Sequence, residues 1–97
     1  MASDQAATTD RLRRALLAFR TAQNLLLQAH RRLKGLSAEE VEAFWLAPGG
    51  RIERHVQGTA TEVVDAFRVF SAAGLIASAE DRHRVTEAQR HLAESKV

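Results

Sequence analysis

A run of apolar residues near the N-terminus, spaced alternately by three and four positions, most constrains how this chain can fold. A turn of 3.6 residues places such residues on one side of a helix, and three unbroken heptads require a long helix. Thr9 or Asp10 can cap this helix and Gly35 can end it, so we predict a helix from about Arg11 to Lys34. The repeating residues are Leu12, Ala15, Phe19, Ala22, Leu26, Ala29 and Leu33.

The apolar surface of this predicted helix is wider than one stripe. Leu16, Leu25 and Leu27 lie beside the heptad positions. A surface this wide can pack on its own domain and also on a second chain, so we interpret the helix as both core and homodimer interface. The predicted dimer interface consists of Leu12, Leu16, Phe19, Leu26 and Leu33.

Shorter helices are predicted after the first one. Ser37 and Glu40 form a capping box, in which side chain and backbone satisfy each other's free groups at a helix start. Pro48-Gly49-Gly50 indicates a turn, Gln57-Gly58 indicates a break, and Gly74 can end a helix. The predicted helices span about residues 38–46, 51–56, 59–72 and 86–94.

Length and composition indicate one helical domain. With 97 residues, the chain is too short for two cores, so we expect a flexible tail over residues 1–9 and a single domain over residues 10–97. Five aromatic residues leave a core made mostly of Leu, Val and Ala. The chain has no cysteine, which excludes disulfides and thiolate sites, and it has no signal-like or membrane-spanning apolar run. We therefore expect a cytoplasmic protein with no membrane partner.

Charge is distributed unevenly along the chain. Residues 11–34 carry seven arginines and lysines and no acid, whereas residues 35–97 carry seven basic and ten acidic residues. A basic N-terminal third can contact phosphates. The same asymmetry can also make the two parts of the chain, or two copies of it, attract each other.

The segment Ile52–Ile76 resembles the DNA-binding region of winged helix-turn-helix regulators of the MarR and GntR types. Ile52 and Val56 match the first helix and Gly58 its turn. The core of the recognition helix and the entry to the wing are matched by Val63, Phe67, Phe70, Gly74, Leu75 and Ile76. With its flanks, the resemblance covers about two thirds of the chain. It implies a mainly α, winged helix-turn-helix-like fold with a long N-terminal helix and room for a small β wing.

The function implied by the resemblance is that of a homodimeric, DNA-binding transcriptional regulator. Its recognition helix would enter the major groove of double-stranded DNA, and strands near residues 75–77 and 84–86 would form the wing. Glu62 and Asp65 depart from the family, because carboxylates oppose phosphate binding. The residues implied in DNA contact are Thr59, Thr61, Arg68, Arg82, His83 and Arg84.

A second interpretation is an all-helical module for protein–protein interaction or dimerisation that does not bind DNA. It is favoured by the broad apolar surfaces and the acidic residues near the reading face, and it predicts one helix over residues 79–94. A third is a similarity to the WxG class of type VII secretion substrates, although Trp45-Leu46-Ala47 lacks that glycine. We interpret Trp45 as a core residue.

Catalytic and metal-binding patterns are weak in this sequence. His83, Glu87 and His91 are spaced by four residues and would share a helix face, which is one spacing that can hold a metal. No further ligand cluster supports them, so we interpret them as a solvated face. No nucleophile–base–acid set stands out either. We therefore expect no enzymatic activity, no metal and no cofactor.

Overall fold

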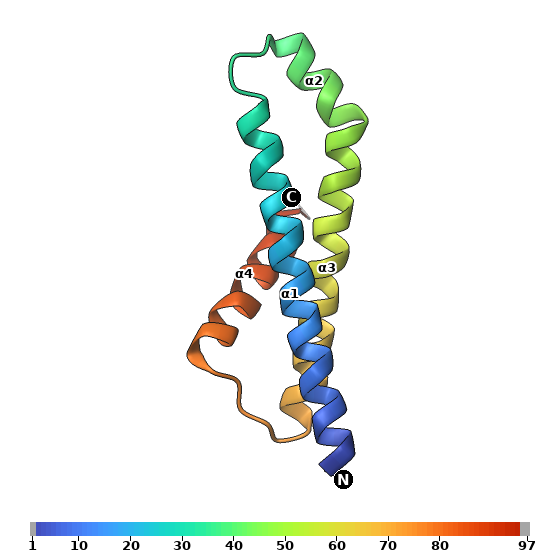
Figure 1. The fold of residues 1–97 in the computed structure, drawn as a ribbon, viewed down its shortest axis with the longest axis vertical. Helices are drawn as coiled ribbons and strands as arrows, with labels where there is room; N and C mark the ends of the chain where they lie inside the picture. Colours follow the sequence, from blue (N-terminus) through green and yellow to red (C-terminus); the bar gives the residue numbers. More distant parts are fainter. Residues whose placement is uncertain (1, 96–97) are drawn as a thin grey trace.

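The computed structural model describes residues 2–95, which form four helices in an elongated arrangement (Figure 1). Helix α1 (Ala2–Arg32) and helix α3 (Pro48–Ala72) run side by side in opposite directions and make a long hairpin. Helix α2 (Ala38–Leu46) joins them at one end, and helix α4 (Ala79–Ser95) packs alongside the middle of the hairpin. The molecule measures 55 × 23 × 22 Å. Because every regular element between residues 2 and 95 is a helix, the predicted mainly helical fold is confirmed.

Helix α1 begins earlier than the sequence pattern predicts. It starts at Ala2 rather than near Arg11, so residues 2–9, expected to be a tail, are helical, while Met1 lies outside the described residues. Three alanines in this segment are strong helix formers, and Asp4 places negative charge in the first turn, where the helix dipole favours it. Despite the length of α1, no helix among residues 2–95 is both long enough and apolar enough to cross a membrane.

Helix α2 begins and ends where the capping box predicts. The Ser37 hydroxyl accepts a hydrogen bond from the Glu40 backbone N–H at 3.2 Å, and the Glu40 carboxylate accepts one from the Ser37 N–H at 3.3 Å. The helix buries no residue completely. Hydrogen bonds to the free backbone groups at its start, more than buried side chains of its own, therefore determine where α2 forms.

Helix α3 is one continuous helix, which corrects the predicted helix-turn-helix. The prediction placed a turn at Pro48–Gly50 and a break at Gln57-Gly58, but both lie inside α3. Pro48 occupies the first turn, where its missing N–H is no loss, and the packing of Val56 and Ala60 carries the helix through Gly58. At the other end the prediction is confirmed, because Gly74 follows the helix with a φ of +80°.

Helix α4 occupies the region where a β wing was expected. It begins at Ala79 and includes residues 84–86, and residues 75–77 form the connection before it, so neither predicted strand is present between residues 2 and 95. The Ser78 hydroxyl accepts a hydrogen bond from the Asp81 N–H at 3.1 Å and caps the helix start. The segment Glu80–Arg82, which lies between the two expected strands, is in the first turn of this helix.

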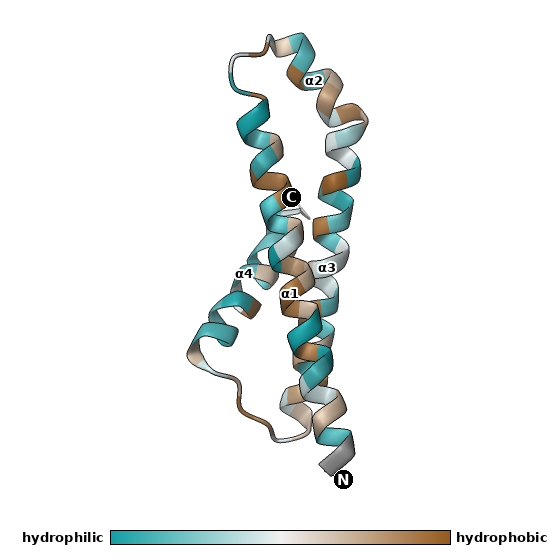
Figure 2. Cartoon of the chain, viewed as in Figure 1, coloured by the Kyte–Doolittle hydropathy of each residue, from teal (hydrophilic) through white to brown (hydrophobic). Residues whose placement is uncertain are grey.

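The core lies where α1, α3 and α4 meet. The predicted heptad of α1 supplies one side of it, and small residues of α3 and α4 allow the helices to approach closely. Figure 2 shows apolar residues on the facing sides of α1 and α3 and hydrophilic residues on much of the remaining surface. The buried cluster consists of Leu12, Ala15, Leu16, Phe19, Ala22, Val56, Ala60, Val63, Ala66, Phe70, Ala77, Val85 and Ala88.

Candidate functional site

The residues of the predicted recognition helix are engaged within α3 itself. The Thr59 hydroxyl donates to the Val56 carbonyl at 2.8 Å, and the Thr61 hydroxyl donates to the Gln57 carbonyl at 3.0 Å. Arg68 lies 3.6 Å from the Asp65 carboxylate in an exposed ion pair one turn away. The threonine hydroxyl protons are thus already donated to the helix backbone.

The residues expected in the wing lie together on α4. The Arg84 guanidinium donates to the Glu80 carboxylate at 3.0 Å, and His83 Nε2 lies 3.0 Å from the Glu87 carboxylate. Arg82 is exposed and makes no ion pair with any described residue. These three side chains therefore belong to a helix packed on the core and not to a hairpin that projects from it.

The predicted dimer interface is largely buried inside the single chain. Leu12, Leu16 and Phe19 belong to the core cluster, and the side chain of Phe19 is only 1% exposed. Leu26 is half-buried against the same cluster, and Leu33 is half-buried near the end of α1. The heptad stripe is thus used to pack α1 against α3 and α4, and a second chain cannot reach most of it.

The side of α1 that faces away from this core carries a different stripe, which the sequence analysis missed. Its members follow one another at intervals of four, three, one and three residues, the spacing of a helix face that contacts another helix. Leu17 is 65% exposed and Leu25 is 45% exposed. We call this stripe the outer seam; it consists of Leu17, Thr21, Asn24, Leu25 and Gln28, all exposed.

Five exposed arginines surround the outer seam. Arg13 and Arg14 precede it, Arg31 and Arg32 follow it, and Arg20 lies at its side. None of the five forms an ion pair within residues 2–95. Arg31 and Arg32 are also in the last turn of α1, where positive charge favours the helix dipole. The outer seam is therefore an uncharged strip with unpaired positive charge at both ends.

Arg11 shows what a paired arginine of α1 looks like. Its Nε donates to the Glu62 carboxylate at 2.7 Å and its second nitrogen donates to the other oxygen at 3.3 Å, which ties α1 to α3. The hydrogen bond from Arg11 lowers the pKa of Glu62, and the same hydrogen bond raises the pKa of Arg11. Bidentate pairing of this kind is the chemistry that the five other arginines offer to a partner.

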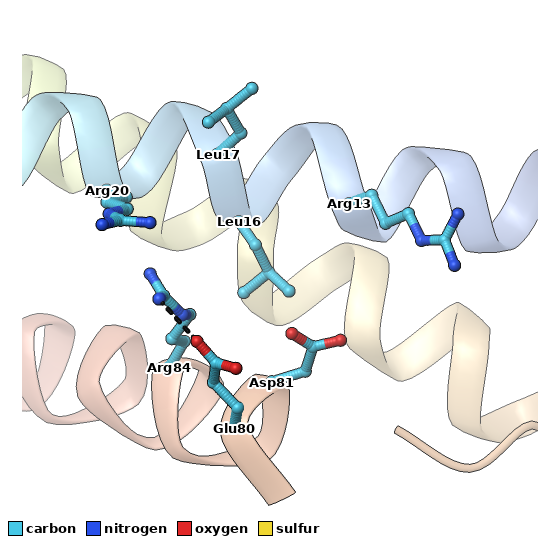
Figure 3. Close-up of a pocket in the computed structure, with 7 residues that line it drawn as sticks. All are labelled: Arg13, Leu16, Leu17, Arg20, Glu80, Asp81 and Arg84. Atoms are coloured by element: carbon cyan, nitrogen blue, oxygen red, sulfur yellow. Dashed lines mark hydrogen bonds and ion pairs between the residues drawn. The ribbon is translucent and has the colours of Figure 1, made fainter. Parts of the chain in front are cut away.

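A crevice lies between α1 and the start of α4, on one side of the outer seam (Figure 3). It is an open space of about 230 Å³ lined by arginines of α1 and by acids of α4. In Figure 3, Leu16 points toward α4, whereas Leu17 points to the opposite side of α1. Arg84 and Glu80 pair across one turn of α4. Because its walls carry both positive and negative charge, the crevice is less suited to bind an anion than Arg14, Arg31 and Arg32, which lie outside it.

The tip of the hairpin, residues 29–52, holds a small aromatic cluster. The ring centroids of His30 and Trp45 lie 5.0 Å apart, and those of Phe44 and Trp45 lie 5.1 Å apart in an edge-on arrangement. Gly49 is buried beneath these rings, and a Cβ atom there would meet both Phe44 and Trp45. Trp45, predicted to be a core residue, is half-buried in this cluster and lies outside the main core.

The polar side chains of the described residues form neither a metal-binding group nor a buried polar cluster. No group of three histidines, aspartates or glutamates among residues 2–95 could hold a metal ion. Glu87 is instead held by His83 and by Gln23, whose Nε2 donates to it at 3.4 Å. No polar or charged residue in this part of the chain is fully buried, so none occupies the water-excluded setting that strongly alters reactivity.

Comparison with family models, with curated proteins and with solved structures gives no match for this chain.

Proposed function

We propose that this chain is an α-helical protein-binding module without enzymatic activity, and that it binds its partner through the outer seam of α1 and the arginines around it. One observation carries the proposal: an exposed helix face combines unpaired arginines with exposed leucines. Arginine is enriched in protein interfaces, and leucines contribute apolar area to them when a partner excludes water.

The amount of exposed surface supports this proposal. The accessible surface is 6788 Å², whereas a compact monomer of 10.7 kDa exposes about 5,500 Å². The radius of gyration is 16.0 Å, against about 12.5 Å for a compact domain of this length. The surplus of about 1,300 Å² exceeds the area of about 800 Å² that each partner buries in a standard interface. The shape thus leaves room for a partner without opening the core.

Protein binding fits this surface better than DNA reading. A groove-reading helix needs free polar side chains on its outer face, but α3 carries Glu62 and Asp65 there and uses its threonine hydroxyls internally. Acidic groups oppose contact with phosphates. The all-helical interpretation also predicted a single helix over residues 79–94, and α4 spans Ala79–Ser95.

The discriminating experiment is a fluorescence-anisotropy titration of a random 20-base-pair duplex with the folded protein at about 50 and 200 mM salt. We expect weak binding or none, because the net charge is only +2. Tight binding that falls steeply with salt and is lost in Arg68→Ala or Arg82→Ala would contradict the proposal. That result would restore the DNA-binding interpretation.

A further inference from the structure

The outer seam has the dimensions of a helix-binding surface. It lies on a continuous 31-residue helix, and its members recur at positions 17, 21, 24/25 and 28. A second helix that packs alongside at about 8–10 Å contacts residues with this spacing. An extended peptide would match a two-residue repeat instead. The spacing therefore favours a helical partner.

The arginines at the two ends of the seam set the charge of that partner. Arg14 and Arg32 are separated by 18 residues of continuous helix, or about 27 Å. Between residues 15 and 29 the only basic or acidic side chain is that of Arg20. A helix laid along this face would therefore meet positive charge near both of its ends and uncharged side chains in its middle.

The acidic side chains of the chain itself leave these charges available. Asp10 lies one turn before Arg14, and Glu80 and Asp81 face Arg13 and Arg20 across the crevice, but no ion pair joins them to these arginines. Arg31 and Arg32 have no acidic residue on α1 after Asp10. The upper end of the seam, near the tip, is thus the more positive one.

A second copy of α1 does not fit this description. In an antiparallel pair, Arg13 and Arg14 would face Arg31 and Arg32 of the other copy, and in a parallel pair like positions would meet like positions. Both arrangements bring unpaired arginines together, and Asp10, one turn before Arg14, is too little negative charge to balance them. The partner that complements the outer seam is therefore a different surface.

Phosphate surfaces fit less well than a helix. Duplex DNA offers no apolar counterpart for Leu17 and Leu25 at its backbone. An anionic membrane needs a continuous apolar face, but Thr21, Asn24 and Gln28 interrupt the leucines. Carboxylates beside leucines on a helix satisfy both kinds of side chain.

We infer that the outer seam binds an amphipathic helix of about five turns, with leucine-like residues in its middle and carboxylates near both ends. This inference rests on the proposed function and adds the secondary structure and the chemistry of the partner. The carboxylates pair with Arg13 and Arg14 at one end and with Arg31 and Arg32 at the other. The central apolar residues cover Leu17 and Leu25.

The test uses the full chain and a fluorescein-labelled synthetic peptide of about 21 residues. The peptide has four leucines on one helix face, two glutamates in its first turn and two in its last, with alanine and glutamine elsewhere. A first control peptide has the same composition with its leucines moved to different faces, and a second carries lysine in place of glutamate. A random DNA duplex and vesicles with one third phosphatidylserine complete the set of probes.

Matched variants separate the outer seam from other exposed positions. Leu17→Gln combined with Leu25→Gln removes the leucines, and Arg14→Glu combined with Arg32→Glu reverses the charge at both ends. Leu46→Gln alters a leucine that is 80% exposed at the end of α2, and Arg51→Glu alters an exposed arginine of α3. All of these positions are exposed, so helicity should be retained and verify the fold of each variant. Only the charge-reversal variant should melt slightly earlier, because Arg32→Glu places negative charge in the last turn of α1.

We expect the acidic leucine peptide to bind at least about tenfold more tightly than either control peptide, and each double variant to weaken it by about tenfold. Leu46→Gln and Arg51→Glu should bind as the parent does. Equal binding of the rearranged peptide would overturn the inference, because charge alone would explain it, and so would absence of binding. Absence of peptide binding would leave the proposed function standing. Binding unaffected by the two α1 double variants would overturn the inference and also the part of the proposed function that places binding at the outer seam. Self-association that is lost in the same variants would overturn the inference. Binding of DNA or vesicles more tightly than the acidic leucine peptide would overturn both the inference and the proposed function.

Discussion

Two parts of the α1–α3 hairpin are built from different kinds of contact. In the part that α4 covers, called the three-helix end because it lies away from the tip, branched and aromatic side chains such as Phe19, Val63 and Phe70 are buried among small residues. At the tip, α2 buries no residue completely and is held by two half-buried rings, a glycine and a capping box. The three-helix end therefore holds most of the folding free energy, and the tip should open at a lower cost.

The largest expected effect is at the three-helix end. Phe19→Ala removes a side chain that is 1% exposed, and the lost burial together with the cavity should lower the free energy of unfolding by about 3–5 kcal/mol. Leu17→Ala, two residues earlier on the exposed side of α1, should change it by less than about 0.5 kcal/mol. Urea unfolding followed by circular dichroism measures both. Similar losses in the two variants would mean that the outer seam is part of the core.

The next effect compares two glycines of α3. A Cβ at position 49 would lie 2.7 Å from Phe44 Cε1 and closer still to Trp45, so Gly49→Ala should destabilise the protein by about 1–3 kcal/mol. Gly58 has nothing within 4 Å of its Cβ position, so Gly58→Ala should stabilise it by about 0.5–1 kcal/mol through helix propensity. Thermal unfolding measures the two shifts, and Trp45 fluorescence reports the tip. A destabilising Gly58→Ala would indicate that the chain needs a bend at that point after all.

A smaller effect should be confined to the tip. Ser37→Ala removes the capping hydrogen bond of α2 and should cost about 1 kcal/mol locally. Because α2 is outside the main core, the loss should appear as faster amide hydrogen exchange over residues 38–46, with little change in the global urea midpoint. Ser71→Ala, at an exposed position of α3, is the control. If Ser37→Ala instead lowered the global free energy of unfolding by the same amount of about 1 kcal/mol, the tip would unfold together with the three-helix end.

The smallest effect is a dependence on pH at the three-helix end. Because the hydrogen bond from Arg11 lowers the pKa of Glu62 in the folded protein, the pair contributes stability above the unfolded-state pKa of about 4.3. That contribution is lost as pH falls through the lowered folded-state pKa. Both side chains are substantially exposed, so the contribution is small. Glu62→Gln should reduce the difference in melting temperature between pH 7 and pH 3, and Asp65→Asn should reduce it less. Equal reductions would show that the Arg11 contact adds nothing.

The sequence predicted most reliably where local chemistry and packing agree. Alternating spacing identified the buried side of α1, and the Ser37–Glu40 capping box placed α2 correctly. Errors arose at Gly58 and Pro48, which were interpreted as breaks. Isolated glycine costs a helix only about 1 kcal/mol, and burial of Val56, Ala60 and Val63 outweighs it. The winged-helix interpretation missed the start of α4, whose first turns are mostly charged and show little apolar periodicity, whereas the all-helical interpretation predicted one helix over residues 79–94.

Much less of the candidate site could be predicted. The apolar width of α1 predicted a second contact surface, which stays a prediction, and Leu16, which was assigned to a second chain, lies in the core. Leu17 was overlooked because the heptad positions dominated the pattern. Which of two neighbouring leucines faces inward depends on where α4 crosses α1, and that is a tertiary contact that one helix cannot encode alone.

The most direct test of the outer seam as a binding site is a ¹⁵N–¹H correlation spectrum of the protein titrated with the acidic leucine peptide. The account predicts that shift changes concentrate at Leu17, Thr21, Asn24, Leu25 and Gln28 and at the arginines of α1, while Thr59, Thr61 and Arg68 stay unchanged. Shift changes centred on α3 or α4, with α1 unaffected, would contradict it.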